Sequence, residues 1–282
     1  MITLQGKATL VTGGGAGIGR AVAESFGALG AKVAVAEIDP RRLALVSAAL
    51  GAAGVDYLAA RADVREAAAV AKLMEDIDKR FGHLDVLVNN VGDYLGLIKP
   101  FADNTDDDWE QLYRMNLWQM FAVTRAALPL MRRGKASGSI INVSSIEAFR
   151  GTPGLTVYCA FKTAITGFTR SLALELGGDG IRVNAIAPET TETEQIKVSE
   201  RLDPQYRDRN PHWIPLGRFG LPSDAAGCAV FLASELSAWV SGATINLDGG
   251  ALAAGGFQRV PDGGWTNTPI VVGSGFNSGR PK

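Results

Sequence analysis

Along most of the chain, short apolar segments alternate with longer segments in which apolar residues recur at helical spacing. The short segments are apolar throughout rather than at alternate positions, which is typical of strands buried on both faces of a sheet. They predict seven strands, at Ala8–Val11, Lys32–Ala36, Asp56–Arg61, Leu84–Val88, Ser139–Val143, Ile181–Ile186 and Thr244–Leu247.

The longer segments carry the helical pattern. Within residues 66–81, for example, Val70, Leu73, Met74 and Ile77 fall on one face of a helix. Helices are expected at Ile18–Leu29, Arg41–Ala53, Glu66–Phe81, Trp109–Met131, Leu155–Leu176 and Ala225–Ala233. Strands that alternate with helices predict an α/β fold, with a doubly wound seven-stranded parallel sheet covered by helices on both faces.

Two segments depart from this alternation. Glu189–Phe219 is polar and has no clear period, and such a long loop in a compact domain is often a lid over a functional site. Ala251–Lys282 is rich in glycine and lies outside the α/β pattern. We expect this extension to be either a disordered tail or an arm packed on a neighbouring subunit.

The composition excludes several classes of protein. The chain has 282 residues, of which 46% are hydrophobic, and its net charge of -1 predicts neither nucleic-acid nor anionic-membrane binding. The two cysteines and two histidines have no metal-ligand spacing, so no metal is expected. No signal-peptide pattern opens the chain, and no apolar run approaches the ~20 residues of a membrane span. We therefore expect a cytoplasmic protein.

A glycine-rich turn follows the first predicted strand. Gly13, Gly17 and Gly19 lie between that strand and a helix. A tight turn favours positive φ, and a pyrophosphate can approach a backbone that carries no Cβ. The free N–H groups at the start of the helix would then hold the phosphate charge. The spacing predicts a dinucleotide site, whereas the alternative is an ordinary glycine-rich connection.

The second predicted strand ends at an acidic residue, Glu37. A carboxylate at this position can accept hydrogen bonds from both ribose hydroxyls of the adenosine and would repel the 2′-phosphate of NADP. Arg41 and Arg42 follow closely and could instead attract that phosphate. We expect NAD to be the cofactor.

A tyrosine and a lysine, Tyr158 and Lys162, are four residues apart in a predicted helix. This spacing places both side chains on one face, where the ammonium would lower the pKa of the phenol. Such a tyrosine can act as a general base toward an alcohol or a general acid toward a ketone. Ser145 ends the fifth strand at the sheet edge where ligands bind in α/β proteins, and its hydroxyl could hold the substrate oxygen.

Together these motifs resemble the short-chain dehydrogenase/reductase family. The resemblance covers Leu4 to Gly250, and it implies that residues 1–250 form a Rossmann-like dinucleotide-binding and catalytic domain, followed by the 251–282 extension. Beyond the residues already named, it is carried by Asn89-Asn90-Val91-Gly92, by Asn116, by Asn184 to Pro188 and by Asp248-Gly249-Gly250.

The resemblance implies a role for each of four catalytic residues. Tyr158 would be the acid/base, Ser145 would position the carbonyl or hydroxyl, and Lys162 would lower the pKa of the tyrosine and bind the nicotinamide ribose. Asn116 would hold a water that links Lys162 to solvent. The implied cofactor-binding residues are Gly13, Gly15, Gly17, Ile18, Gly19, Glu37, Asp63, Val64, Asn90, Val91, Gly92, Tyr158, Lys162, Pro188 and Thr193.

Within the cofactor set, Asp63 and Val64 would flank the adenine, and Thr193 would bond the nicotinamide carboxamide. Three residues depart from the usual family pattern: Val91 replaces alanine, Phe161 replaces serine and Glu189 replaces the glycine after Pro188. The last change bears on the backbone near the nicotinamide.

The substrate is less well defined by the sequence. The pocket walls are expected from residues 93–97, 146–155 and 189–219, and we expect a mostly apolar pocket in which Glu147 and His212 are merely solvated. The apolar side chains available are Tyr94, Leu95, Phe149, Leu155, Trp213 and Ile214.

The favoured function is an NAD-dependent oxidoreductase for a secondary alcohol or ketone, apolar and of cyclic or steroid-like shape. The alternatives are a 3-oxoacyl-thioester reductase and a non-catalytic NAD-binding protein. The family resemblance implies a homotetramer, and the apolar residues of Gln258–Lys282 predict that this segment reaches a neighbouring subunit.

Overall fold

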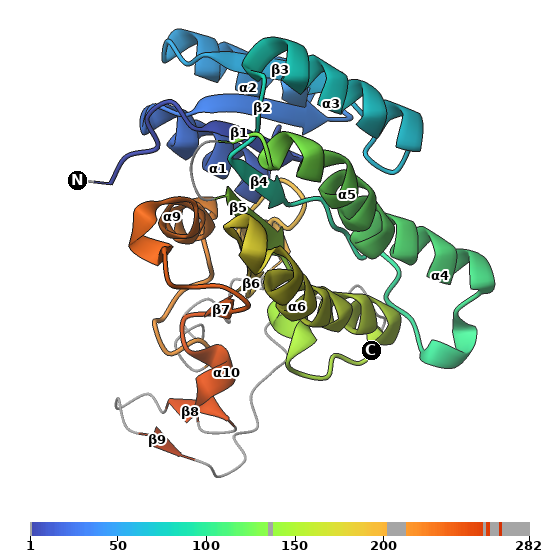
Figure 1. Cartoon of the computed structure of the whole chain (residues 1–282). Helices are drawn as coiled ribbons and strands as arrows, with labels where there is room; N and C mark the ends of the chain where they lie inside the picture. Colours follow the sequence, from blue (N-terminus) through green and yellow to red (C-terminus); the bar gives the residue numbers. More distant parts are fainter. Residues whose placement is uncertain (1, 135–137, 202–212, 256–257, 260–264, 267–282) are drawn as a thin grey trace.

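The computed structural model describes residues 2–134, 138–201, 213–255, 258–259 and 265–266. In this part of the chain, seven parallel strands form one sheet in the order β3-β2-β1-β4-β5-β6-β7 (Figure 1). The predicted parallel sheet is thus confirmed. Its strands are β1 (Ala8–Thr12), β2 (Lys32–Glu37), β3 (Tyr57–Arg61), β4 (Val86–Asn89), β5 (Gly138–Val143), β6 (Ile181–Pro188) and β7 (Thr244–Leu247).

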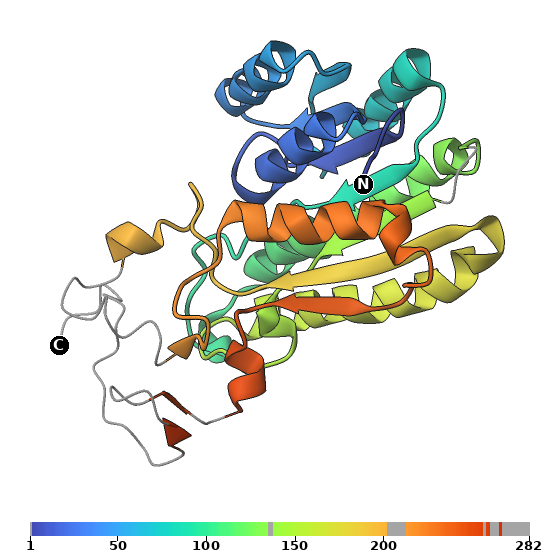
Figure 2. The ribbon, with the colours of Figure 1, turned by 90° about the vertical axis from the view of Figure 1, so that its left-hand side faces the viewer.

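Helices cover both faces of the sheet, as the alternating pattern predicts (Figure 2). One face carries α1 (Gly17–Ala28), α2 (Pro40–Ala52) and α9 (Pro222–Ala233). The other carries α3 (Ala67–Phe81), α5 (Gln119–Met131) and α6 (Thr156–Leu176).

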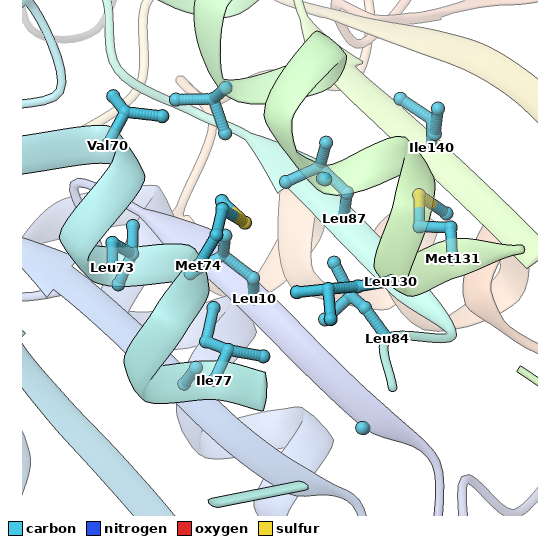
Figure 3. Packing of buried hydrophobic residues seen from close by; sticks show 14 of the residues in the cluster. Leu10, Val70, Leu73, Met74, Ile77, Leu84, Leu87, Leu130, Met131 and Ile140 are labelled. Carbon is cyan, nitrogen blue, oxygen red and sulfur yellow. The ribbon is translucent and has the colours of Figure 1, made fainter. Parts of the chain in front are cut away.

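Each helical layer packs its own hydrophobic core against the sheet. On the α3 and α5 side, Leu73 and Ile77 meet Leu10 and Leu87 of the strands, and all four are at most 1% exposed (Figure 3). On the α1 and α9 side, Phe26 lies in the second core and is fully buried. Burying apolar surface on both faces stabilises the sheet and explains why most residues of its central strands are apolar.

The strand order places a crevice at one edge of the sheet. β1 pairs with β2 on one side and with β4 on the other. From β1 the chain passes to β2 and β3 on one side, and it then crosses back to place β4 on the other side of β1. The connections that follow β1 and β4 therefore lead away from each other. In doubly wound sheets, ligands bind in the crevice at the carboxyl ends of such strands.

The helix expected at Trp109–Met131 is not a single α-helix. It begins earlier, at α4 (Asp106–Tyr113), where the Thr105 hydroxyl accepts a hydrogen bond from the Asp108 N–H. A π-helical turn at Arg114–Trp118 separates α4 from α5. The Asn116 side chain donates to the carbonyl of Leu112 within this stretch, at 2.9 Å. An amide that bonds a main-chain carbonyl competes with the regular helical ladder.

The remaining described elements are short. They are η1 (Phe101–Asp103), η3 (Ile146–Ala148), η4 (Gly177–Asp179), α7 (Val198–Arg201), η6 (Glu235–Ser237), α10 (Ala251–Ala254), β8 (Gln258–Arg259) and β9 (Trp265–Thr266). Residues 202–212 of the expected lid, with His212, and most of the 251–282 extension lie outside the described residues. Among those that are described, no helix has both the length and the hydrophobicity for a membrane crossing.

Candidate active site

A cavity of about 430 Å³ opens at the carboxyl ends of β1 and β4. It runs from the end of β2 past the glycine turn to the start of α6, and it brings together most of the residues singled out from the sequence. Those that line it are Gly13, Gly17, Ile18, Glu37, Asp63, Val64, Asn90, Val91, Gly92, Ser145, Tyr158, Lys162, Pro188 and Thr193.

Gly15, Gly19 and Asn116, which the sequence also singles out, are not among the residues that line the cavity. A Cβ on Gly19 would lie 2.3 Å from the carbonyl oxygen of Gly13, closer than atoms can approach. A Cβ on Gly15 would meet the Glu37 side chain at 2.7 Å. Gly17 opens α1 with φ of 51°, in the left-handed region that favours glycine. The turn therefore presents bare backbone at the start of a helix.

The Glu37 carboxylate is fixed by backbone amides at the end of β2. Its Oε2 accepts a hydrogen bond from the Gly15 N–H at 3.1 Å, and its Oε1 accepts from Ile38 and Asp39. The side chain is 5% exposed and lines the cavity. The neighbouring Asp39 instead caps α2 by accepting from the Arg41 N–H at 2.8 Å. Of the two acids, Glu37 is the one that faces the site.

Asp63 and Val64 line the same end of the cavity. The hydrogen bond from Arg65 to Asp63, 2.8 Å between Nη2 and Oδ2, holds the pKa of that carboxyl below its usual value. Asn90 joins the end of β4 to the glycine turn, because its Nδ2 donates to the carbonyls of Thr12 and Gly13 at 3.0 and 3.2 Å. The turn is therefore held in shape without any ligand.

At the other end of the cavity, α6 carries Tyr158 and Lys162 on one face. Lys162 Nζ lies 5.5 Å from the centroid of the tyrosine ring and donates to the Val143 carbonyl at 3.2 Å. The Ser144 hydroxyl donates to the Lys162 carbonyl at 2.8 Å and so attaches α6 to the end of β5. This attachment places Ser145 beside Tyr158, and the two side chains are hydrogen-bonded.

The pKa of Tyr158 differs from the sequence-based expectation. Burial raises it well above its usual value, and the charges of Glu147 and Asp93 raise it further, while the hydrogen bond with Ser145 lowers it. Burial also lowers the pKa of Lys162 to about 8, against the opposing charge of Asp93. The expected lowering of the phenol pKa by Lys162 is therefore wrong for this structure, because desolvation of both groups dominates.

Asn116 is fully buried in the π-helical turn. Its Oδ1 accepts from the Asp93 N–H at 3.1 Å, and its Nδ2 donates to the Asp93 carbonyl at 2.8 Å. A Cβ on Gly92 would lie 3.1 Å from Asn116 Oδ1 and 2.7 Å from Lys162 Nζ, so both side chains converge on this glycine. Asn116 thus fixes the loop after β4, and a water relay through it stays a prediction.

Known proteins are similar to this chain over most of its length. Residues 13–251 match the protein family described as enoyl-(acyl carrier protein) reductase. The chain is 38% identical over 249 residues to the 3-oxoacyl-[acyl-carrier-protein] reductase of Thermotoga maritima, a match that covers 88% of this chain and 98% of that protein. This chain belongs to the short-chain dehydrogenase/reductase family.

Other members of the short-chain dehydrogenase/reductase family are similarly related. The galactitol 2-dehydrogenase of Agrobacterium fabrum is 36% identical over 255 residues, covering 88% of this chain and 98% of that protein. A solved 7α-hydroxysteroid dehydrogenase, complexed with NADH and 7-oxo glycochenodeoxycholic acid, superposes with a TM-score of 0.81 at 31% identity and covers 88% of this chain and 95% of that chain. The relatives therefore share oxidoreductase chemistry on different substrates.

In this short-chain dehydrogenase/reductase, the segment after β6 lies over the glycine turn. Thr193 lies close to Gly17, where an added Cβ would be 3.1 Å from its Cγ2. Glu194 Oε2 accepts a hydrogen bond from the Gly17 N–H at 2.9 Å. A carboxylate thus satisfies the first free N–H group of α1, a role that an anion commonly takes at a helix start.

The substrate end of the cavity is more charged than the sequence predicts. Glu147 is not simply solvated: its side chain is 15% exposed, and its Oε1 accepts from Arg150 Nη2 at 2.8 Å. Arg150 also forms an ion pair with the buried Glu189, 2.6 Å between Nη1 and Oε2. Burial lowers the pKa of Arg150, but its hydrogen bonds to both acids raise it to a net value above normal.

The expected apolar wall forms only in part. Tyr94 and Leu155 line the cavity, and the Tyr94 ring stands edge-on to Tyr158, with centroids 6.3 Å apart. Phe149 and Trp213 are 42% and 48% exposed, and Ile214 lies in a second cavity of about 540 Å³ behind Pro188. Among the described residues, no cluster of side chains is suited to hold a metal ion.

Sequence reasoning missed Arg150 and Glu194. Arg150 follows Glu147 at the helical i, i+3 spacing, which is a weak signal in a predicted loop. Nothing in the sequence near Glu194 points to the amide of Gly17, because the two residues are 177 positions apart.

Proposed function

We propose that this protein is an NAD-dependent oxidoreductase that interconverts a secondary alcohol and its ketone. The observation that carries the proposal is the placement of Tyr158, Ser145 and Lys162 at one end of a cavity whose other end is the glycine turn and Glu37. The residues at both ends of the cavity lie near the carboxyl ends of the strands of one sheet, where this class of fold binds its ligands.

The residues of the glycine turn fit a dinucleotide. A side chain at Gly19 would be blocked by the Gly13 carbonyl, and the left-handed Gly17 starts a helix whose first N–H is bonded by the Glu194 carboxylate, which a bound phosphate would have to displace. Such a cradle suits a pyrophosphate. Glu37, Asp63 and Val64 would hold the adenosine, and Asn90, Lys162, Pro188 and Thr193 would line the path to the nicotinamide. When bound, NAD⁺ supplies the hydride acceptor that turns a secondary alcohol into a ketone, with release of one proton.

Glu37 supports NAD over NADP. Its carboxylate has fixed geometry, because three backbone N–H groups bond it, and it is almost fully buried beside Arg42. A ribose with free hydroxyls can donate to this acceptor, whereas a 2′-phosphate would meet its negative charge.

Tyr158 supplies or accepts the proton. The raised pKa keeps its phenol protonated near neutral pH, which suits a proton donor to a ketone oxygen held by Ser145. In the oxidation direction Tyr158 must first lose this proton, so alcohol oxidation should increase as the pH rises. Lys162, with its pKa lowered to about 8, stands behind the ring and would exchange that proton onward.

The substrate class is a neutral secondary alcohol with a compact or cyclic carbon body, which would pack on Tyr94 and Leu155. A 3-oxoacyl-thioester reductase is the second candidate, and its support is the 38% identity to the Thermotoga maritima reductase. Glu37 argues against it, because biosynthetic reduction commonly draws on NADPH.

The test is absorbance at 340 nm with NAD⁺ and NADP⁺ offered separately, against linear, cyclic and steroidal secondary alcohols and 3-hydroxyacyl thioesters. Turnover of an alcohol with NAD⁺ supports the proposal, and turnover of thioesters with NADP⁺ supports the second candidate. The Tyr158→Phe variant should lose about a hundredfold or more of its activity while it still binds NADH. Full activity of that variant would contradict the mechanism.

A further inference from the structure

Beside the proposed catalytic residues lies a group of charged side chains that hydride transfer does not itself require. It consists of Glu147, Arg150 and Glu189, here called the Glu147–Arg150–Glu189 cluster. Arg150 Nη2 donates to Glu147 Oε1 at 2.8 Å and to Glu189 Oε1 at 2.9 Å. The Glu189 side chain is 2% exposed and the Glu147 side chain 15%, so the more accessible carboxylate is that of Glu147.

The cluster has an excess of negative charge. Arg150 binds a carboxylate at each end of its guanidinium, so its donors are already engaged by the protein. The two acids outnumber the one base, and Asp93 lines the same cavity. A substrate that carries a carboxylate or phosphate near its reacting carbon would meet repulsion here, since like charges in a partly buried site are poorly screened.

Glu147 is two residues from Ser145, the residue proposed to hold the substrate oxygen, and its carboxylate also accepts a hydrogen bond from the Thr152 hydroxyl. It follows Ser145 in the short helix η3, and its N–H donates to Ser145 Oγ at 3.2 Å. Ser145, Tyr158 and Glu147 all line the same cavity. A substrate held by Ser145 and Tyr158 would therefore share this cavity with the Glu147 side chain. An ionised carboxylate only accepts hydrogen bonds, so the group that complements it is a donor.

We propose that Glu147 is a specificity-determining residue that accepts a hydrogen bond from a second hydroxyl group of the substrate, next to the reacting carbon. The preferred substrates are then neutral vicinal diols and the corresponding hydroxyketones, ahead of simple alcohols and hydroxy acids. Glu189 is a positioning residue that acts through Arg150, because it holds the guanidinium from the buried side. This inference rests on the proposed function.

Three probes with the same ring test it: cyclohexane-1,2-diol, cyclohexanol and 2-hydroxycyclohexanecarboxylate, with NAD⁺ and detection at 340 nm. The unmodified protein should prefer the diol to cyclohexanol by about tenfold or more in kcat/KM, because a site built to bond a hydroxyl discriminates against its absence. The hydroxy acid should be the poorest substrate of the three.

Substitution of Glu147 should remove this preference. In Glu147→Ala the ratio of kcat/KM for diol and cyclohexanol should fall to within about threefold of one. Glu147→Gln should restore part of the preference, since its amide oxygen still accepts a hydrogen bond. Relative to the unmodified protein, Glu189→Gln should raise KM for the diol by a larger factor than the factor by which it lowers kcat for cyclohexanol. The control is Glu235→Gln, an exposed acid paired with Lys7 at the opposite edge of the sheet, which should leave the ratio unchanged.

The outcomes separate the two proposals. If the unmodified protein oxidises cyclohexanol and the diol equally well, or if Glu147→Ala keeps the diol preference, the inference is wrong and the proposed function stands. If no secondary alcohol is oxidised with either cofactor, the proposed function is wrong and the inference falls with it. NADH binding by each variant, followed by fluorescence, shows that a loss of preference is not a loss of the fold.

Discussion

The two ends of the cavity are built differently. At the glycine turn the walls are mainly backbone, and Gly19 packs so closely on Gly13 that no side chain fits. At the start of α6 the walls are charged or ionisable side chains, of which Lys162 and Glu189 are buried. Backbone that is already bonded within the fold costs little to bury, whereas a buried charge costs free energy unless it is paired.

This difference explains how the two ends respond to change. The glycine turn is sensitive to added volume, because its shape depends on close backbone contacts. The α6 end is sensitive to changes of charge, because the charge of Glu147 raises the pKa of Tyr158, and the hydrogen bonds that Arg150 donates to Glu147 and Glu189 raise the pKa of Arg150. The following substitutions test the contrast.

The largest effect is expected from Gly19→Ala. Its Cβ would lie 2.3 Å from the Gly13 carbonyl oxygen and 2.5 Å from Asn90 Nδ2, so the turn must shift. We expect NADH affinity to fall about tenfold to a hundredfold, measured by fluorescence titration. Gly227→Ala in α9 is the matched control, because its Cβ would meet no atom within 4 Å. Unchanged affinity in Gly19→Ala would show that backbone packing at this end is not critical.

At the α6 end of the cavity, Lys162→Met should change activity and stability in opposite directions. Burial lowers the pKa of Lys162 from 10.5 to about 8, so the unfolded chain binds this proton more tightly than the folded one. The variant should lose activity yet gain about 1–3 kcal/mol in free energy of unfolding at pH 7. The gain should persist below pH 8, shrink as the pH rises from 8 to 10.5, and vanish above that range.

Denaturant unfolding at several pH values measures this gain. Lys72→Met in α3 is the control, because its side chain is 62% exposed and no stabilisation is expected. A Lys162→Met protein that is less stable than the original at pH 7 would mean that the ammonium is better paired than its burial indicates.

The smallest effect is expected from a substitution of Glu194, which lies in the segment after β6. Its carboxylate bonds the N–H of Gly17 at 2.9 Å, the same group proposed to receive the pyrophosphate. Glu194→Gln removes a negative charge from this point, so NADH should bind about two- to fivefold more tightly. Glu200→Gln, an exposed acid paired with Lys197, should not change the affinity. Weaker binding by Glu194→Gln would instead assign the carboxylate a supporting role.

The same contrast shows what could be predicted from the sequence. The strands and the glycine turn follow from local patterns, because short, mostly apolar runs and the spacing of glycines can be recognised from neighbouring residues. The pairing of Tyr158 with Lys162 can be predicted from helical spacing. The upward shift of the Tyr158 pKa cannot be predicted in this way, because desolvation depends on residues that other elements pack around the hydroxyl.

Contacts between residues that are distant in the sequence also cannot be predicted from local patterns. Arg150 and Glu189 are 39 residues apart, in the segments that follow the paired strands β5 and β6. The turn at Arg114–Trp118 was missed for a different reason. Its apolar spacing continues that of the helix on either side, and the amide of Asn116 that bonds Leu112 is visible only in three dimensions.

That π-helical turn also constrains the length of the chain. Each residue in an α-helix turns it by about 100°, so the residues between Leu112 of α4 and Val123 of α5 fix the angular phase of one half against the other. Leu112 and Val123 are both buried. Adding or removing one residue within this stretch would rotate α5 by about 100° and turn Val123 and Ala127 out of the core against the sheet. The helix can change length at its ends, but not where it carries Asn116.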